Sequence, residues 1–286
     1  MRIPFLALTL SVIFLGVCTS VKAIGHVSPL HTLLILLGAV TAHISVNLFN
    51  EFHDYRSGLD AITHKTPFSG GSGALIDDPG SVNYVQNVAA ISLCISICIG
   101  GYFAYVVGPK ILLIGIFGVA IILTYTQWIN RYALLCLIAP GVAFGPLMII
   151  GTHFILTGEW SWYSLFISLV PFFLSNNLLL LNQFPDISAD KSVGRRHFPI
   201  VYGLEKSIAV YAMSSIAVIL ILLVLVLKET SMMGYVALIP VTAQLLSVIG
   251  VIRYAEQREK LIPYMSINVV AAVITPILVG LSIVSS

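Results

Sequence analysis

Two acidic clusters hold most of the chemistry-bearing side chains of this apolar sequence. The first places four side chains at the spacings i, i+3, i+4 and i+7, which is one face of a helix: Asn47, Asn50, Glu51 and Asp54. Carboxylates that share a face at membrane depth repel one another unless a cation lies between them. Hard oxygen ligands of this kind suit Mg²⁺ better than a transition metal. Asp60 follows in a loop beyond the predicted end of the helix.

The second cluster repeats this pattern further along the chain. Its amide and carboxylate residues follow one another at steps of four: Asn182, Asp186 and Asp190. Basic residues stand directly after them: Lys191, Arg195 and Arg196. Pro185 predicts a bend or a new helix start at this point. Acidic clusters with flanking cations indicate a site that grips a diphosphate through metal ions, since both groups stabilise the charge of a leaving phosphate.

The elements that must position these clusters are transmembrane helices. The 286 residues are 58% hydrophobic and 9% charged, whereas about a quarter of the residues of a typical soluble domain are charged. A span needs about 20 mostly apolar residues, and nine segments qualify: 3–23, 29–53, 82–107, 110–128, 133–156, 161–183, 204–228, 233–253 and 262–284. We therefore expect an all-α membrane protein. Its single domain, residues 1–286, would be a bundle of nine helices around a central cavity open to the cytoplasm and to lipid.

The distribution of positive charge predicts how the bundle is oriented. Eleven Lys and Arg residues fall on the side of the N-terminus and three on the other. By the positive-inside rule, the N-terminus and the two long loops, 54–81 and 184–203, are cytoplasmic in the cell membrane and the C-terminus is outside. Residues 1–23 also read as a secretory signal peptide. Arg2 and the eight later spans favour a retained first helix.

Residues outside the two clusters have weaker signals. Lys65 lies in a glycine-rich loop, residues 64–73, that either presents N–H groups to an anion or serves as a flexible linker. Arg131 is a phosphate contact or a positive-inside anchor, and Tyr125 is a candidate for the cavity wall. His43 is either a hydrogen-bonded core residue or a cavity residue. The cysteines are interpreted as packing residues: Cys18, Cys94, Cys98 and Cys136.

Over essentially its whole length the chain resembles the UbiA superfamily of intramembrane prenyltransferases, which are nine-helix bundles that use Mg²⁺ and two Asp-rich motifs. Residues 50–60 match the first motif in the spacing of the menaquinone branch, which prenylates 1,4-dihydroxy-2-naphthoate. Residues 66–73 and 144–152 also resemble that branch, and residues 182–196 match the second motif.

The resemblance and the residue types together predict roles for individual residues. Two Mg²⁺ ions would be held by oxygen ligands from both motifs: Asn50, Glu51, Asp54, Asp60, Asn182, Asp186 and Asp190. The diphosphate would also contact amide and basic groups: Asn50, Asn182, Lys65, Lys191, Arg195, Arg196 and Arg131. Catalysis would fall to Asp54, Asp186, Asp190, Lys65 and Tyr125. Three departures from the family pattern are Glu51 in place of Asp, His197 in place of Thr, and the lack of a carboxylate in residues 134–141.

The predicted function is Mg²⁺-dependent transfer of a prenyl group from a polyprenyl diphosphate to an aromatic acceptor in quinone biosynthesis, with 1,4-dihydroxy-2-naphthoate as the first choice. Alternative acceptors are 4-hydroxybenzoate and a glycerol-phosphate lipid. A cation-coupled transporter is the alternative of another class, and it predicts carboxylates at the midplane and an internal repeat. The expected partners are the two substrates and the lipid bilayer, with neither a nucleic acid nor an obligatory protein partner.

Overall fold

Long apolar helices build almost the whole of the described chain, which is residues 5–229 and 231–286 of a computed structural model, without the side chain of Glu229. Eight helical segments of this part are long and apolar enough to cross a membrane. They are α1 (Leu6–Ile24), α2 (Pro29–Arg56), η2 with α5 (Pro79–Ser81 and Val82–Val107), α7 to α8 (Ala133–Val142 and Met148–Thr157, joined by a π-helical turn, Ala143–Leu147), α9 (Trp162–Asn182), α11 (Phe198–Glu229), α12 (Met232–Tyr254) and α13 (Arg258–Val284). Arg2, the expected N-terminal anchor, lies outside the described residues.

The segment expected as the fourth span is shorter than the sequence indicated. Helix α6 covers Ile111–Thr124, which is 14 residues, or about 21 Å at 1.5 Å per residue. A bilayer core is about 30 Å thick. The helix ends where polar residues begin, and the chain continues through a turn into a short 3₁₀ helix, Ile129–Arg131. A ninth span therefore stays a prediction.

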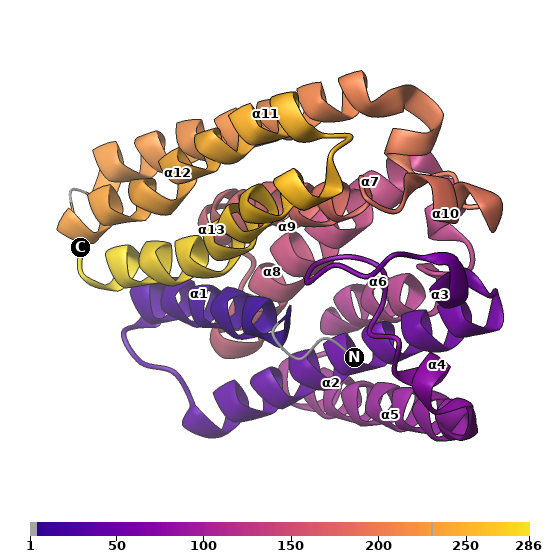
Figure 1. Cartoon of the computed structure of the whole chain (residues 1–286). Helices are drawn as coiled ribbons and strands as arrows, with labels where there is room; N and C mark the ends of the chain where they lie inside the picture. The colour runs from indigo at the N-terminus through magenta and orange to yellow at the C-terminus, as the bar shows by residue number, and fades with distance from the viewer. Residues whose placement is uncertain (1–4, 230) are drawn as a thin grey trace.

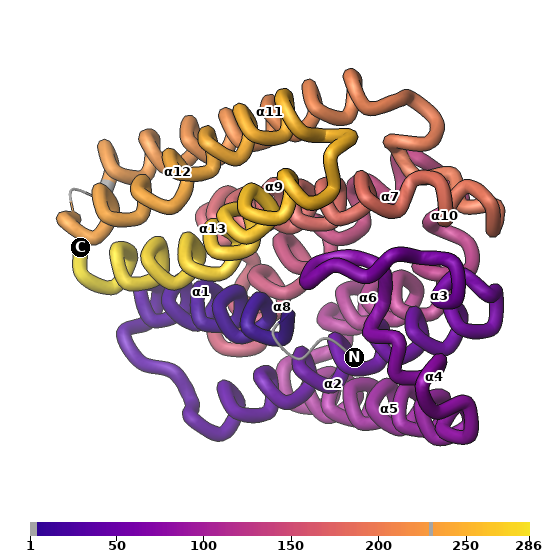
Figure 2. The backbone as a smooth tube through the Cα atoms, in the orientation of Figure 1, coloured from indigo at the N-terminus to yellow at the C-terminus, as the bar shows by residue number. Residues whose placement is uncertain are grey.

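The C-terminal helices form a scaffold on one side of the bundle. Figures 1 and 2 show α11, α12 and α13, in orange and yellow, running alongside one another, with α1 next to α13. Buried aliphatic side chains from α1, α9, α11, α12 and α13 make one core cluster, which includes Leu8, Ile167, Leu222, Val241 and Ala271. Two buried amides form one polar contact inside this scaffold: Gln244 Nε2 donates to Asn268 Oδ1 at 2.8 Å, while Gln244 Oε1 and Asn268 Nδ2 have no hydrogen-bond partner in the described part of the chain.

Paired amides satisfy backbone groups at the centre of the bundle. Asn176 on α9 accepts from the Gly141 N–H at 2.6 Å, close to the π-helical turn, which contains Pro146. Asn177 Nδ2 donates to the Tyr211 carbonyl and to Ser215 Oγ, both at 3.0 Å. Both amides are buried, and their hydrogen bonds offset the cost of placing polar groups in an apolar medium.

Short helices gather at one end of the bundle and hold the polar loops. These are α3 (Leu59–Ile62), α4 (Ala74–Asp77) and α10 (Ile187–Ser192). Figure 1 shows α3 next to the C-terminal end of α2 and α10 on the same end of the molecule. Gly58, with φ of 75°, lies between α2 and α3. This left-handed conformation favours glycine and ends α2 before Asp60. Asp60 itself lies in the short helix α3, so the expectation that it lies in a loop was wrong.

Candidate active site

A cavity of about 960 Å³ lies between the helices and ends at the two acidic clusters. Its wall along α2 changes character with position: Ile35, Gly38, Ala39 and Ala42 line it first, and Asn47, Asn50, Glu51 and Asp54 line it toward the C-terminal end of that helix. Helices α5, α6 and α8 add apolar lining residues such as Phe103, Ile114 and Met148. The cavity is therefore an apolar chamber with a polar end.

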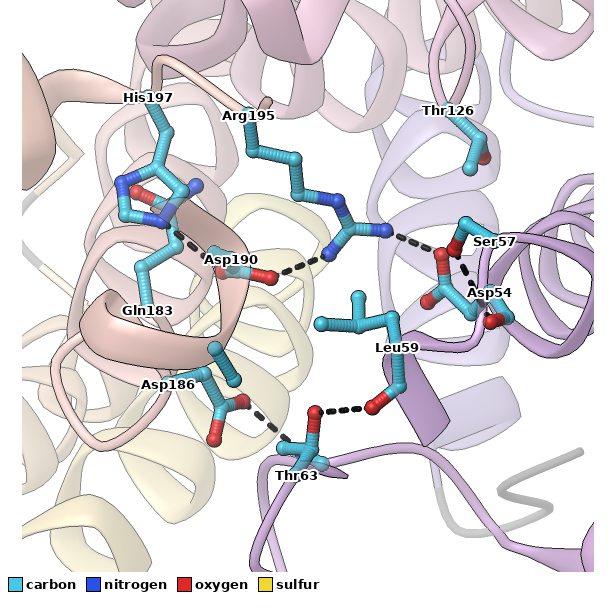
Figure 3. Close-up of polar contacts among 12 residues, drawn as sticks. Asp54, Ser57, Leu59, Thr63, Thr126, Gln183, Asp186, Asp190, Arg195 and His197 are labelled. Carbon is cyan, nitrogen blue, oxygen red and sulfur yellow. Dashed lines mark hydrogen bonds and ion pairs between the residues drawn. The ribbon is translucent and has the colours of Figure 1, made fainter. Parts of the chain in front are cut away.

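Arg195 joins the two clusters at the polar end. Its Nη1 donates to Asp190 Oδ1 at 2.8 Å, and its Nη2 forms an ion pair with Asp54 Oδ1 (Figure 3). The two carboxylates, on α2 and α10, are 136 residues apart in the sequence. Burial opposes the charge on Arg195, but the carboxylates of Asp54 and Asp190 outweigh it and raise the pKa of the guanidinium. Arg195 is thus a permanent cation between the motifs.

The other oxygens of these two carboxylates also have partners. Asn50 Nδ2 donates to Asp54 Oδ2 at 2.9 Å, and Thr126 Oγ1 donates to Asn50 Oδ1 at 3.1 Å. His197 Nε2 lies 2.9 Å from Asp190 Oδ2. His197, for which the sequence offered no role, is therefore a direct neighbour of the second motif, as Figure 3 shows.

The glycine-rich loop lies against both clusters. Asp186 accepts hydrogen bonds from Ser69 Oγ at 3.2 Å and from the Gly70 N–H at 2.9 Å, and Ser72 donates to Glu51. A Cβ at Gly71, whose φ is 67°, would overlap the Asp60 carboxylate. The loop is therefore packed against the two clusters rather than being a flexible linker. The anion that its Gly70 N–H binds is the carboxylate of Asp186.

The oxygen atoms at the polar end of the cavity are of the type that Mg²⁺ prefers as ligands. They are carboxylate and amide oxygens, which hard cations prefer, and Asn182 Oδ1 lines the cavity, buried and without a hydrogen-bond partner in the described part of the chain. Within that part no three His, Cys, Asp or Glu side chains are close enough to hold one ion. Of the residues present, those of the two motifs are the ones that could hold a divalent cation.

Four of the predicted diphosphate contacts lie away from the cavity wall. The side chains of Lys65, Lys191, Arg131 and Arg196 are exposed and are not lining residues. The Lys65 ammonium lies against Gly73, where a Cβ would overlap it. The Arg196 backbone N–H donates to the Asn130 carbonyl at 2.9 Å, so Arg196 contacts the residues of the site through its backbone. Of the predicted cations, the structure brings Arg195 to the cavity.

A second polar patch on the wall was largely missed from the sequence. Tyr125, Cys136 and Gln183 line the cavity, and Gln183 Nε2 donates to Cys136 Sγ at 3.4 Å. Burial raises the pKa of Tyr125 well above its usual value, so its phenol stays neutral. Tyr125 was expected here, but the sequence marked Cys136 only as a packing residue. His43 also lines the cavity, and its Nδ1 lies 2.6 Å from Thr9 Oγ1, so both interpretations of this histidine hold.

Similar proteins agree with this architecture. A 184-residue match at 28% identity, covering 64% of this chain and 58% of the relative, is to 1,4-dihydroxy-2-naphthoate octaprenyltransferase of Bacillus subtilis (strain 168). The match thus spans less than two thirds of that relative. A UbiA homolog from Aeropyrum pernix K1 superposes with a TM-score of 0.69 at 16% identity, over 97% of each chain. A UbiA homolog from Archaeoglobus fulgidus bound to GPP and Mg²⁺ gives a TM-score of 0.65 at 17% identity, over 100% of this chain and 99% of that one.

The family assignment rests on the sequence as well as on the fold. Residues 9–270 match the model of the UbiA prenyltransferase family, which is most of the chain. This range contains both acidic clusters, Arg195 and the glycine-rich loop. The protein therefore belongs to the UbiA prenyltransferase family.

Proposed function

We propose that this protein transfers a prenyl group from a polyprenyl diphosphate to an aromatic acceptor, with Mg²⁺ as cofactor. The observation that carries the proposal is the meeting of two acidic motifs and Arg195 at the polar end of one apolar cavity. A prenyl diphosphate has the matching shape, with an anionic head and an apolar tail. The Archaeoglobus homolog of the same fold, which binds GPP and Mg²⁺, supports this pairing of ligand and cofactor.

The residues of the polar end would hold the diphosphate and favour its departure. Two Mg²⁺ ions, when bound, would neutralise the charge that develops on the leaving diphosphate. Asp54, Asp186 and Asp190, with Asn50 and Asn182, are the proposed ligands of these ions. Arg195 would donate to diphosphate oxygens, and its position among the residues that line the cavity supports this role. When the allylic C–O bond breaks, its electron pair leaves with the diphosphate.

The apolar part of the cavity would protect the reactive half of the substrate. An allylic cation reacts with water unless the site is dry, and the wall beyond the polar end is mostly aliphatic and aromatic. The loop that joins Ser69 and Gly70 to Asp186 lies over the same end. It would limit the access of water while the acceptor ring attacks the allylic carbon and forms the new C–C bond. The ring carbon that attacks would then lose its own substituent, as a proton or as carbon dioxide, and the electron pair of that bond would restore the aromatic ring.

The acceptor proposed is 1,4-dihydroxy-2-naphthoate, because the Bacillus subtilis relative is named as a transferase to this compound. The neutral hydrogen-bonding patch of Tyr125 and Gln183 supports an acceptor with hydroxyl groups, since it lines the cavity near Asp190 and Arg195. The lack of a carboxylate in residues 134–141 leaves 4-hydroxybenzoate as the first alternative to test.

The transporter hypothesis is less well supported by the same geometry. A transporter would hold its ion-binding carboxylates near the midplane, whereas here they lie at helix ends and in the adjoining loops. The carboxylates also meet at one end of the bundle. By the positive-inside rule we place this end in the cytoplasm.

Product analysis would test the proposed function. Membranes that contain the protein are supplied with geranylgeranyl diphosphate, Mg²⁺ and one acceptor at a time: 1,4-dihydroxy-2-naphthoate, 4-hydroxybenzoate or a glycerol-phosphate lipid. We expect a prenylated naphthalene product that disappears when Mg²⁺ is chelated. Absence of any prenylated product with all three acceptors, from protein that is folded and membrane-inserted, would refute the assignment.

A further inference from the structure

We propose that Arg195 is a built-in counter-cation that occupies the metal site until Mg²⁺ and the diphosphate arrive together. This inference rests on the proposed function, because it concerns how the same site takes up its ligands. Without ligands, the guanidinium holds the two acidic motifs together. On binding, it moves from the carboxylates to the diphosphate. Mg²⁺ alone therefore binds the site weakly, and the metal ion binds together with the prenyl diphosphate.

The contacts of the two carboxylates carry the first step of the argument. One oxygen of Asp54 and one of Asp190 pair with the two terminal nitrogens of Arg195. The remaining oxygens pair with Asn50 Nδ2 and His197 Nε2, both at 2.9 Å. All four carboxylate oxygens thus have partners within the chain, and a metal ion that binds between the two carboxylates must displace the Arg195 guanidinium from that position.

Burial makes Arg195 the partner that matters. The side chains of Asp54 and Asp190 are 8% and 4% exposed, and that of Arg195 is 17% exposed. Two carboxylates this deeply buried need a cation beside them. A fork of two N–H donors to two carboxylates is also stronger than a contact between neutral groups.

The second step concerns what Arg195 contacts after it is displaced. If Mg²⁺ alone takes the carboxylates, the guanidinium is left buried beside a divalent cation and has lost both anionic partners. Such an unpaired buried charge is costly. A diphosphate changes this, because its oxygens accept from Arg195 while they also ligate the metal. The metal ion and the diphosphate therefore bind with positive coupling, because each lowers the free-energy cost of binding the other.

The direct test measures Mn²⁺ binding in detergent micelles, followed by the loss of the free Mn²⁺ signal in electron paramagnetic resonance. Mn²⁺ is used because it takes the same oxygen ligands as Mg²⁺. The proteins are wild type, Arg195→Gln, Arg195→Lys and the control Arg56→Gln. Arg56 is exposed at the end of α2 and contacts the Phe52 ring rather than the carboxylates.

With Mn²⁺ alone, Arg195→Gln should bind at least about tenfold more tightly than wild type, and Arg56→Gln should bind as wild type does. Arg195→Lys should also bind more tightly than wild type, because one ammonium replaces a two-nitrogen fork. Equal affinities of wild type and Arg195→Gln would overturn the proposal. If wild type and Arg195→Lys bind Mn²⁺ with equal affinity, any positive charge at this position has the same effect, and the bridging role of the two guanidinium nitrogens is overturned.

A second measurement needs no variant, so it stands even if Arg195→Gln does not fold. Wild type is titrated with Mn²⁺ with and without geranylgeranyl S-thiolodiphosphate, an unreactive analogue in which sulfur replaces the bridging oxygen. The analogue should tighten Mn²⁺ binding at least about tenfold beyond its own chelation, measured without protein. If Mn²⁺ binds equally tightly without the analogue while prenyl transfer proceeds, only this inference fails. If the protein binds neither ligand and forms no product, the proposed function fails with it.

Discussion

Replacing Asp186 by Asn tests whether this carboxylate both binds metal and fastens the glycine-rich loop. The carboxylate accepts from Ser69 Oγ at 3.2 Å and from the Gly70 N–H at 2.9 Å. Hydrogen bonds to a charged group contribute about 1.5–3 kcal/mol each, and neutral ones about 0.5–1.5 kcal/mol. The amide keeps the shape but loses the charge, so the attachment of the loop should weaken by about 2–3 kcal/mol over the two bonds.

The effect on the reaction should be larger than the effect on the loop. Loss of a group that stabilises developing charge typically lowers kcat by about 10²–10³, so we expect Asp186→Asn to lose at least this factor in prenyl transfer. Ser69→Ala leaves the carboxylate intact and removes one loop contact, and it should lower the rate by about tenfold or less. Asp77→Asn, an exposed carboxylate outside the cavity lining, is the matched control and should behave as wild type.

The assay is prenyl transfer in membranes, with thermal unfolding in detergent to show that each variant is folded. Limited proteolysis within the glycine-rich loop, residues 64–73, reports its attachment, and cleavage should be faster in both Asp186→Asn and Ser69→Ala. A folded Asp186→Asn variant that retains activity within about threefold of wild type would refute the metal role, because RT ln 3 is well below the contribution of a metal ligand. Unchanged proteolysis would refute the loop contact.

The remaining predictions address other parts of the site and fold. Gly71→Ala should lower activity by about tenfold or more, because its Cβ would overlap the Asp60 carboxylate at a φ of 67°; unchanged kinetics would show that the loop adopts another conformation. Asn176→Leu should lower the free energy of unfolding by about 1–3 kcal/mol, because it removes the hydrogen bond that Asn176 Oδ1 accepts from the Gly141 N–H; a thermal midpoint equal to that of wild type in detergent would contradict this. Lys191→Ala should raise the KM for the prenyl diphosphate by less than about fivefold with kcat unchanged, because an exposed cation steers a ligand more than it stabilises it; a large loss of kcat would place Lys191 in the site.

The sequence alone determined the class of protein and the location of its chemistry. Apolar runs of sufficient length predict transmembrane helices because backbone groups in lipid must be satisfied within the segment. The spacing of Asn50, Glu51 and Asp54 predicts one polar face because side-chain positions repeat with the helical period. Gly58 marks the end of α2 for an equally local reason, since its φ of 75° suits glycine. These properties depend on neighbours in the chain.

The tertiary structure decided which polar residues share the site. Two adjacent arginines have different environments in the structure. Arg195 bridges Asp54 and Asp190, whereas the side chain of Arg196 is exposed. In the sequence Cys136 resembles the other cysteines, since all four lie in apolar segments. In the structure it lines the cavity, because α7 orients its side chain toward Gln183. Such choices depend on how helices pack across more than a hundred residues of chain, and no local pattern encodes that packing.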